Sequence, residues 1–107
     1  MKAGILRVHI LESDHYRGQA LFEAIVSRCR ELKIAGATVF RGLEGYGETG
    51  ELHREHLLHH DQPIVVVIVD TRENLDRLLP ALEEMVGSGV LATSEVEMIR
   101  VQKNALS

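Results

Sequence analysis

A glycine-rich segment has the composition of a loop that binds an anion. Gly42, Gly45, Gly47 and Gly50 follow one another closely. Glycine admits backbone conformations of positive φ and lets main-chain N–H groups approach a phosphate closely. A Walker-type loop would need a lysine after the glycines, and a dinucleotide fingerprint would need a helix there. The segment has neither signature, so a flexible surface loop is the simpler interpretation and a phosphate cradle the alternative.

The next residues, 51–60, carry a cluster of histidines. In a helix, His53, His56 and His60 would fall at i, i+3 and i+7 and line one face, with His59 just off it. Imidazole is a good ligand for zinc, copper and nickel, so this cluster is a candidate metal site. The spacing matches no closed metal site, and so short a helix is marginal in water unless it docks on something. The alternative is a solvated loop that responds to protonation.

A second glycine pair and a lone cation lie further along the chain. Gly87 and Gly89 precede the last expected strand and form either a ligand loop or a helix C-cap. Arg100 stands in an otherwise apolar stretch, as an anion contact or an interface ion pair. No Ser-His-Asp or Cys-His arrangement is legible, and no base has a matched acid. The sequence therefore predicts a protein that is not an enzyme.

Alternating strands and helices must position these residues. Period-2 and β-branched patterns predict strands, and stripes of 3.6-residue period predict helices. The expected elements are strands over 5–12, 37–41, 63–70 and 96–101, and helices over 17–33 and from 71 or 72 to 86. Their order predicts an α+β, ferredoxin-like βαββαβ sandwich, with an antiparallel four-stranded sheet and two helices on one face. We expect residues 1–107 to form one such domain, with a long loop over 42–62.

Local signals predict the helix ends. Gly36 is expected to cap the first helix at its C-terminus. Asp70 is expected to be the N-cap of the second helix, with Glu73 completing a capping-box pattern, and Pro80 to kink that helix. Cys29 falls within the apolar stripe of the first helix, so we expect a core residue rather than a nucleophile.

The strand over 63–70 is apolar on both faces, although two helices can cover only one face of the sheet. In ferredoxin-like topology this strand and the first one are the central pair, so Arg7 and His9 share the bare face with its apolar side chains. A large exposed apolar face usually marks an interaction surface, and another copy of the chain is the economical cover. We therefore expect a subunit interface there.

Length, composition and charge exclude several classes of protein. The 107 residues are 45% hydrophobic and 26% charged, as in a folded globular domain. The net charge is −4, with no basic run that would bind nucleic acid. The longest apolar run, 64–69, is too short for membrane insertion, and no signal peptide is visible. A single cysteine excludes an intramolecular disulfide, and these features favour the cytoplasm.

Short motifs along the chain are similar to those of one family. They are Glu12-Ser13-Asp14, Gly18, AGATVFRG at 35–42, Gly45-Tyr46-Gly47, PIVVVIVD at 63–70 and EEMVGSG at 83–89. With them the chain resembles, over nearly its whole length, the family called domain of unknown function 190. That family in turn resembles the PII signal-transduction proteins. Those proteins are ferredoxin-like trimers that bind adenine nucleotides in clefts between subunits and present a long T-loop to membrane transporters and enzymes.

The resemblance implies ligand contacts at individual residues. Thr38 would lie near the adenine, and Gly47 near the phosphates. The remaining implied contacts are Gly45 and Tyr46 at the base of the T-loop, Gly87 and Gly89 in the B-loop, and Arg100 as the cation near the C-terminus. The pattern departs from PII proteins where they carry cations: Glu48-Thr49 replaces an Arg-Gln pair, and Val90 replaces a lysine. Each lost charge-assisted contact costs about 1.5–3 kcal/mol. A ligand with fewer phosphates than ATP, another small anion, or no ligand in the cleft fits better.

We therefore predict a cytoplasmic, homotrimeric, PII-like signalling protein that senses a small ligand between subunits. The resemblance implies an adenine nucleotide as the ligand, and a membrane transporter, channel or enzyme as the partner that the loop contacts. The alternative is a metal-binding trimer similar to the divalent-ion tolerance proteins, in which His53, His56 and His60 carry the function. A third interpretation is an oligomeric adaptor whose loop is a constitutive docking peptide. The residues themselves designate no cofactor.

Overall fold

The computed structural model describes residues 2–46, 53–54 and 61–103. Its long strands are β1 (Lys2–Leu11), β4 (Ala37–Arg41), β7 (Pro63–Thr71) and β8 (Val90–Glu97), and its helices are α1 (Leu21–Glu31) and α2 (Arg72–Met85). Two small hairpins pair β2 (His15–Tyr16) with β3 (Gln19–Ala20), and β5 (Glu44–Gly45) with β6 (His53–Arg54).

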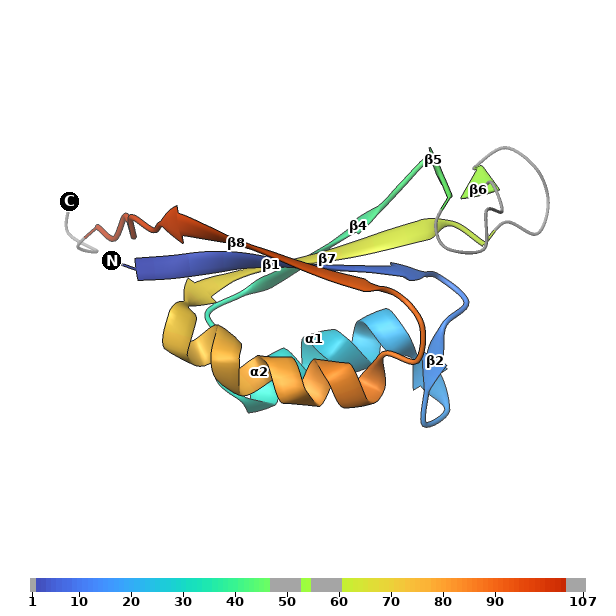
Figure 1. Ribbon diagram of the computed structural model, residues 1–107, viewed down its shortest axis with the longest axis horizontal. Coiled ribbons are helices and arrows are strands. Elements are labelled where there is room, and N and C mark those ends of the chain that lie inside the picture. The colour runs from blue at the N-terminus through green and yellow to red at the C-terminus, as the bar shows by residue number, and fades with distance from the viewer. Residues whose placement is uncertain (1, 47–52, 55–60, 104–107) are drawn as a thin grey trace.

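The long strands form one antiparallel sheet in the order β4-β7-β1-β8. Both helices lie on the same side of this sheet, and the other side stays open (Figure 1). The predicted α+β architecture is confirmed, and so is the central pairing of β1 with β7. The expected strand over 37–41 is also reproduced.

The core lies between the sheet and the helices. Alternate residues of β1 and β7 are buried there, which is the period-2 pattern expected for one covered face. The most deeply buried apolar side chains are Leu6, Val8, Leu21, Ile25, Ile64, Val66, Ile68, Leu75, Leu78 and Leu82. Cys29 is also buried, and its burial raises the pKa of the thiol to about 11. The expectation that Cys29 is a core residue is confirmed.

The first helix is shorter than predicted at both ends. Residues 17–20 form the turn and second strand of the β2–β3 hairpin, because Arg17 and Gly18 adopt left-handed φ values of 49° and 82°. At the other end, Lys33 takes the left-handed position with φ 59°, and the N–H of Ile34 donates to the carbonyl of Cys29. The prediction that Gly36 caps this helix is therefore wrong.

The N-cap of the second helix lies one residue later than predicted. Thr71 is the N-cap, and its hydroxyl accepts a hydrogen bond from the N–H of Asn74 at 3.2 Å. Asp70, predicted to fill that position, is instead buried at the end of β7. The helix continues through Pro80 to Met85.

The last strand lies earlier in the chain than predicted. β8 ends at Glu97, so most of the predicted strand over 96–101 follows it. β8 is an edge strand, and half or more of its side chains are exposed. Hydrogen bonding to β1, rather than apolar alternation, therefore sets its limits. Arg100 lies beyond the strand on which it was expected.

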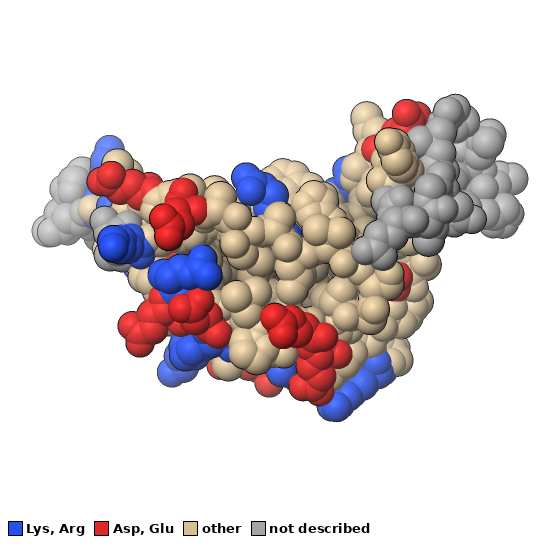
Figure 2. All heavy atoms as spheres, in the orientation of Figure 1, with Lys and Arg blue, Asp and Glu red and all other residues tan. Residues whose placement is uncertain are grey.

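The open face of the sheet is largely apolar. The register places Thr38, Val67 and Arg7 in one row across it, and Phe40, Val65 and His9 in the next. Phe40 is 56% exposed, whereas the valines are half-buried. Figure 2 shows this face edge-on along the upper side of the molecule, where residues other than Lys, Arg, Asp and Glu make up most of the middle stretch.

Candidate functional site

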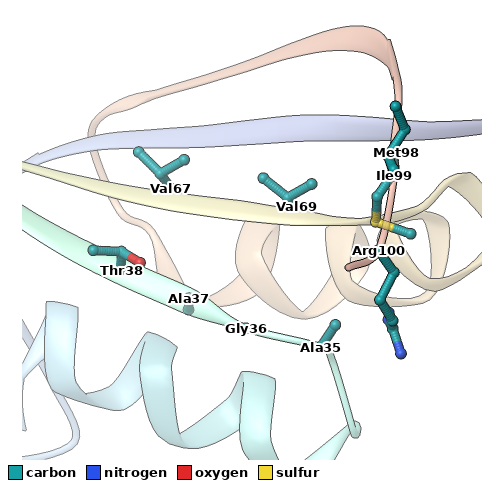
Figure 3. A pocket seen from close by; sticks show the side chains of 9 residues that line it. All are labelled: Ala35, Gly36, Ala37, Thr38, Val67, Val69, Met98, Ile99 and Arg100. Carbon is teal, nitrogen blue, oxygen red and sulfur yellow. The ribbon is translucent and has the colours of Figure 1, made fainter. Parts of the chain in front are cut away.

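A cavity of about 600 Å³ lies at the start of β4. Figure 3 shows Thr38 on β4 beside Val67 and Val69 on β7, with the segment that follows β8 across from them. The lining residues of this Thr38 cavity are Ala35, Gly36, Ala37, Thr38, Val67, Val69, Met98, Ile99 and Arg100. The structure therefore brings together two predicted ligand contacts, Thr38 and Arg100. The cavity combines an apolar wall with one hydroxyl and one cation.

Asp70 organises the backbone beside the Thr38 cavity. Its carboxylate is 2% exposed and accepts hydrogen bonds from the N–H of Ala35 at 2.8 Å, the N–H of Thr71 at 2.6 Å and the amide of Asn74 at 3.1 Å. Burial alone raises the pKa of Asp70, but these donors and the charge of Arg100 outweigh burial and lower the pKa below its usual value. A charged Asp70 thus ties the residue before Gly36 to the start of α2.

A second cavity, of about 370 Å³, is lined by residues at the other end of the sheet. It is formed where β1 ends, β7 and β8 begin, and the β5 segment folds back. The lining residues of this Gly89 cavity are His9, Ile10, Leu11, Asp14, Gly42, Glu44, Gly45, Tyr46, Pro63, Ile64, Val65, Ser88, Gly89 and Val90. Three more predicted contacts, Gly45, Tyr46 and Gly89, therefore lie together.

Close backbone approach explains two of the glycines around the Gly89 cavity. A Cβ at Gly89 would lie 2.7 Å from the carbonyl oxygen of His9, and one at Gly42 would lie 2.7 Å from Cγ of Pro63. Neither position has room for a side chain. The glycines thus allow the loop before β8 and the start of the 42–62 segment to pack against β1 and β7.

The charges around the two cavities differ. The described residues that line the Gly89 cavity include Asp14 and Glu44 but no lysine or arginine. The charged lining residue of the Thr38 cavity is Arg100. Anionic groups of a ligand are therefore better accommodated beside Thr38 than beside Gly89.

Two of the predicted ligand contacts are not placed in either cavity. Gly47 lies outside the described residues. Gly87 is described and exposed, but it lines neither cavity, and no atom lies within 4 Å of the position that its Cβ would take. Within the B-loop motif, Ser88 and Gly89 line the Gly89 cavity.

Most of the predicted metal site lies outside the described residues. His53 belongs to β6, where it pairs with Gly45, so the expected helical spacing fails at its first residue. His56 and His60 lie outside the described residues. Among the residues that are described, no group of three or more His, Cys, Asp or Glu side chains is arranged to hold a metal ion.

Sequence reasoning missed several residues of these sites. Met98 and Ile99 were assigned to a strand, yet they line the Thr38 cavity. Asp70 was assigned to a helix cap, yet it organises the adjacent backbone. A signal for Asp70 was present, because an acidic residue closing a continuous apolar strand must find donors if it is buried.

Comparison with known proteins identifies the family. The model of the family of uncharacterised proteins described as DUF190, Uncharacterized ACR, matches residues 3–98. The chain belongs to this family. A UPF0166 protein from Aquifex aeolicus is 34% identical over 103 residues, covering 92% of this chain and 95% of that protein. A UPF0166 protein from Methanocaldococcus jannaschii is 33% identical over 87 residues, covering 80% of this chain and 81% of the relative.

Solved structures show the same fold at lower identity. CPII, a nitrogen regulatory PII-like protein from Thiomonas intermedia solved with ADP, AMP and bicarbonate, has a TM-score of 0.69 at 19% identity, over 94% of this chain and 91% of that one. The divalent ion tolerance protein CutA1 from Ehrlichia chaffeensis has a TM-score of 0.64 at 13% identity, over 92% and 84%. The chain therefore shares the fold of these proteins, which is the fold that the resemblance implied. Among the described residues, neither helix has the length and apolar character that crossing a bilayer requires.

Proposed function

We propose that this protein is a cytoplasmic, homotrimeric, PII-like regulatory protein. It binds a small ligand between copies and signals through residues 42–62 to a membrane transporter, channel or enzyme. One observation carries the proposal: the predicted contacts that the structure describes fall mainly into two cavities at opposite ends of one sheet. In a ring of copies with head-to-tail contacts, opposite ends of neighbouring copies meet. Such a ring therefore requires that each end carry one part of the binding site.

The open face supports the assembly step. Phe40 is 56% exposed and Val90 48% exposed, and half-buried valines lie between their strands. Covering such a face with a second copy removes apolar area from water at about 25 cal/mol per Å². The contact would also set the Thr38 cavity of one copy beside the Gly89 cavity of the next.

The ligand that fits best is an adenine nucleotide with one or two phosphates. The described lining of the Gly89 cavity offers no cation to a polyphosphate and carries two carboxylates. In the Thr38 cavity, Arg100 offers one cation. CPII, which shares the fold, was solved with ADP and AMP. Without the two further cations of the PII pattern, ATP is expected to bind about a hundredfold more weakly than it would with them.

Native mass spectrometry with AMP, ADP and ATP tests this function. The expected spectrum is a trimer that carries up to three copies of AMP or ADP and little ATP. Arg100→Gln, which removes the cation of the Thr38 cavity, should reduce nucleotide occupancy and leave the trimer intact. A trimer that ignores all three nucleotides would overturn the ligand assignment, and a monomer would overturn the assembly.

The same experiment with zinc tests the metal-binding alternative. The fold shared with CutA1 is the reason for testing it. Retention of zinc that is lost on replacing His53, His56 and His60 together would favour that alternative. Nucleotide binding that survives this triple replacement would favour the regulatory function.

A further inference from the structure

The turn Glu12-Ser13-Asp14, which follows β1, touches both ends of the 42–62 segment. On one side, Oε2 of Glu12 accepts a hydrogen bond from the guanidinium of Arg41 at 2.5 Å. On the other side, the N–H and hydroxyl of Ser13 donate to the two carboxylate oxygens of Asp61, at 2.9 and 2.5 Å. Consecutive residues of one turn therefore hold the residue before the segment and a residue at its end.

Backbone hydrogen bonds also join the turn to the two segments that lead into and out of residues 42–62. The N–H of Glu12 donates to the carbonyl of Gln62 at 2.9 Å, and the N–H of Gly42 donates to the carbonyl of Pro63 at 2.7 Å. The turn is itself fixed, because Oδ2 of Asp14 accepts from the N–H of Leu11 at 2.9 Å. The contacts thus link β1, the end of β4 and the start of β7 at one point.

This point borders the Gly89 cavity. Gly42, Tyr46 and Pro63, which form the wall on the side of the 42–62 segment, line the cavity together with Leu11 and Asp14 from the turn and its approach. A shift of the turn would move that wall. We propose that Glu12 and Ser13 are positioning residues for the Gly89 cavity, which hold both ends of the 42–62 segment in the geometry that binds ligand. The proposal rests on the proposed function for the identity of the ligand.

The contacts are suited to positioning rather than to general stability. The side chains of Arg41 and Glu12 are 51% and 34% exposed, and exposed ion pairs add little to the free energy of unfolding. A wall already held in the binding geometry avoids the ordering cost that a mobile wall would incur on binding. Loss of the turn's contacts should therefore weaken ligand binding more than it weakens folding.

The test compares Glu12→Gln, Ser13→Ala and the double variant in the full-length protein. ADP affinity measured by calorimetry should fall about two- to fivefold for each single variant and roughly tenfold for the double variant. Glu31→Gln is the matched control, because it neutralises an exposed partner of Arg28 on α1 and takes no part in these contacts. It should leave ADP affinity unchanged. The charge reversal Glu12→Arg with Arg41→Glu should recover most of the affinity that Glu12→Gln loses.

Amide hydrogen exchange tests whether these contacts hold the segment in the absence of a ligand. Exchange at the N–H groups of Gly42 and Glu12 should accelerate about tenfold in the double variant, because local opening becomes easier there, whereas exchange at Val66 in the core should not change. Unchanged exchange at Gly42 and Glu12 would overturn the positioning role. If the wild-type protein binds no ADP but these amides accelerate as expected, the proposed ligand fails and the positioning of the segment stands.

Discussion

Asp70 shows how one side chain shapes a cavity that it does not line. Its carboxylate holds the N–H of Ala35, immediately before Gly36, and the N–H of Thr71, at the start of α2. A buried carboxylate needs hydrogen-bond donors, and these two N–H groups supply them. The direction of the Gly36–Thr38 backbone thus depends on a charge at the end of the neighbouring strand.

The replacement Asp70→Asn should lower the free energy of unfolding at pH 7 by about 1–3 kcal/mol, because an amide cannot accept from all three donors. The folded-state pKa of Asp70 lies below its unfolded value, so the folded state binds this proton less tightly. The stabilisation is therefore complete above about pH 4 and is lost as pH falls through the folded-state pKa. Urea denaturation at pH 7 and pH 3 should show the difference between wild type and variant shrinking at pH 3. A difference that stays constant with pH would contradict this role.

At the level of elements, the prediction succeeded where the residue pattern is strongly that of a strand and failed where exposed backbone decides. β1 was predicted from its alternation, whereas β4 and β7 were predicted from their β-branched and aromatic residues. β8 was misplaced because its side chains are largely exposed and the apolar residues that suggested a strand follow it. The β2–β3 hairpin was missed because its turn needs positive φ at Arg17, a residue type that seldom signals such a turn.

The residues of the candidate sites also divide into those that the sequence could predict and those that it could not. Motif residues such as Thr38, Gly45 and Gly89 could be nominated from the sequence, and the structure places them in cavities. The sequence could not predict which of these residues share a cavity, because that depends on strand register. Nor does local sequence indicate the pairing of Ser13 with Asp61, which lie 48 residues apart.

Replacement of Thr71 by alanine tests the corrected N-cap of α2. Thr71→Ala should lower the free energy of unfolding by about 1 kcal/mol, because the N–H of Asn74 loses its acceptor. Thr71→Ser keeps the hydroxyl and should be close to wild type, which equilibrium urea denaturation can establish. Equal stability of the alanine and serine variants would contradict the assignment of Thr71 as the cap.

For the whole molecule, the account depends on the open face being covered by other copies. Ile5 is suited to a test, because it lies on that face between Val69 and Ser94 and lines none of the cavities described. Ile5→Glu should shift the assembly from trimer to monomer, since burying an unpaired charge costs several kcal/mol. Ile5→Val should stay trimeric. Analytical ultracentrifugation distinguishes these outcomes, and a wild-type protein that sediments as a monomer would refute the interface.

Complementation between subunits tests the central claim, that one ligand site combines the Thr38 cavity of one copy with the Gly89 cavity of the next. Arg100→Ala impairs the first cavity and Tyr46→Ala the second, and each variant alone should bind ADP poorly. In a mixed ring of three, one junction always joins the two unimpaired cavities. Native mass spectrometry of refolded mixtures should therefore show one ADP on each mixed trimer and little on the unmixed ones. Mixed trimers that carry no more ADP than the single variants would contradict the claim.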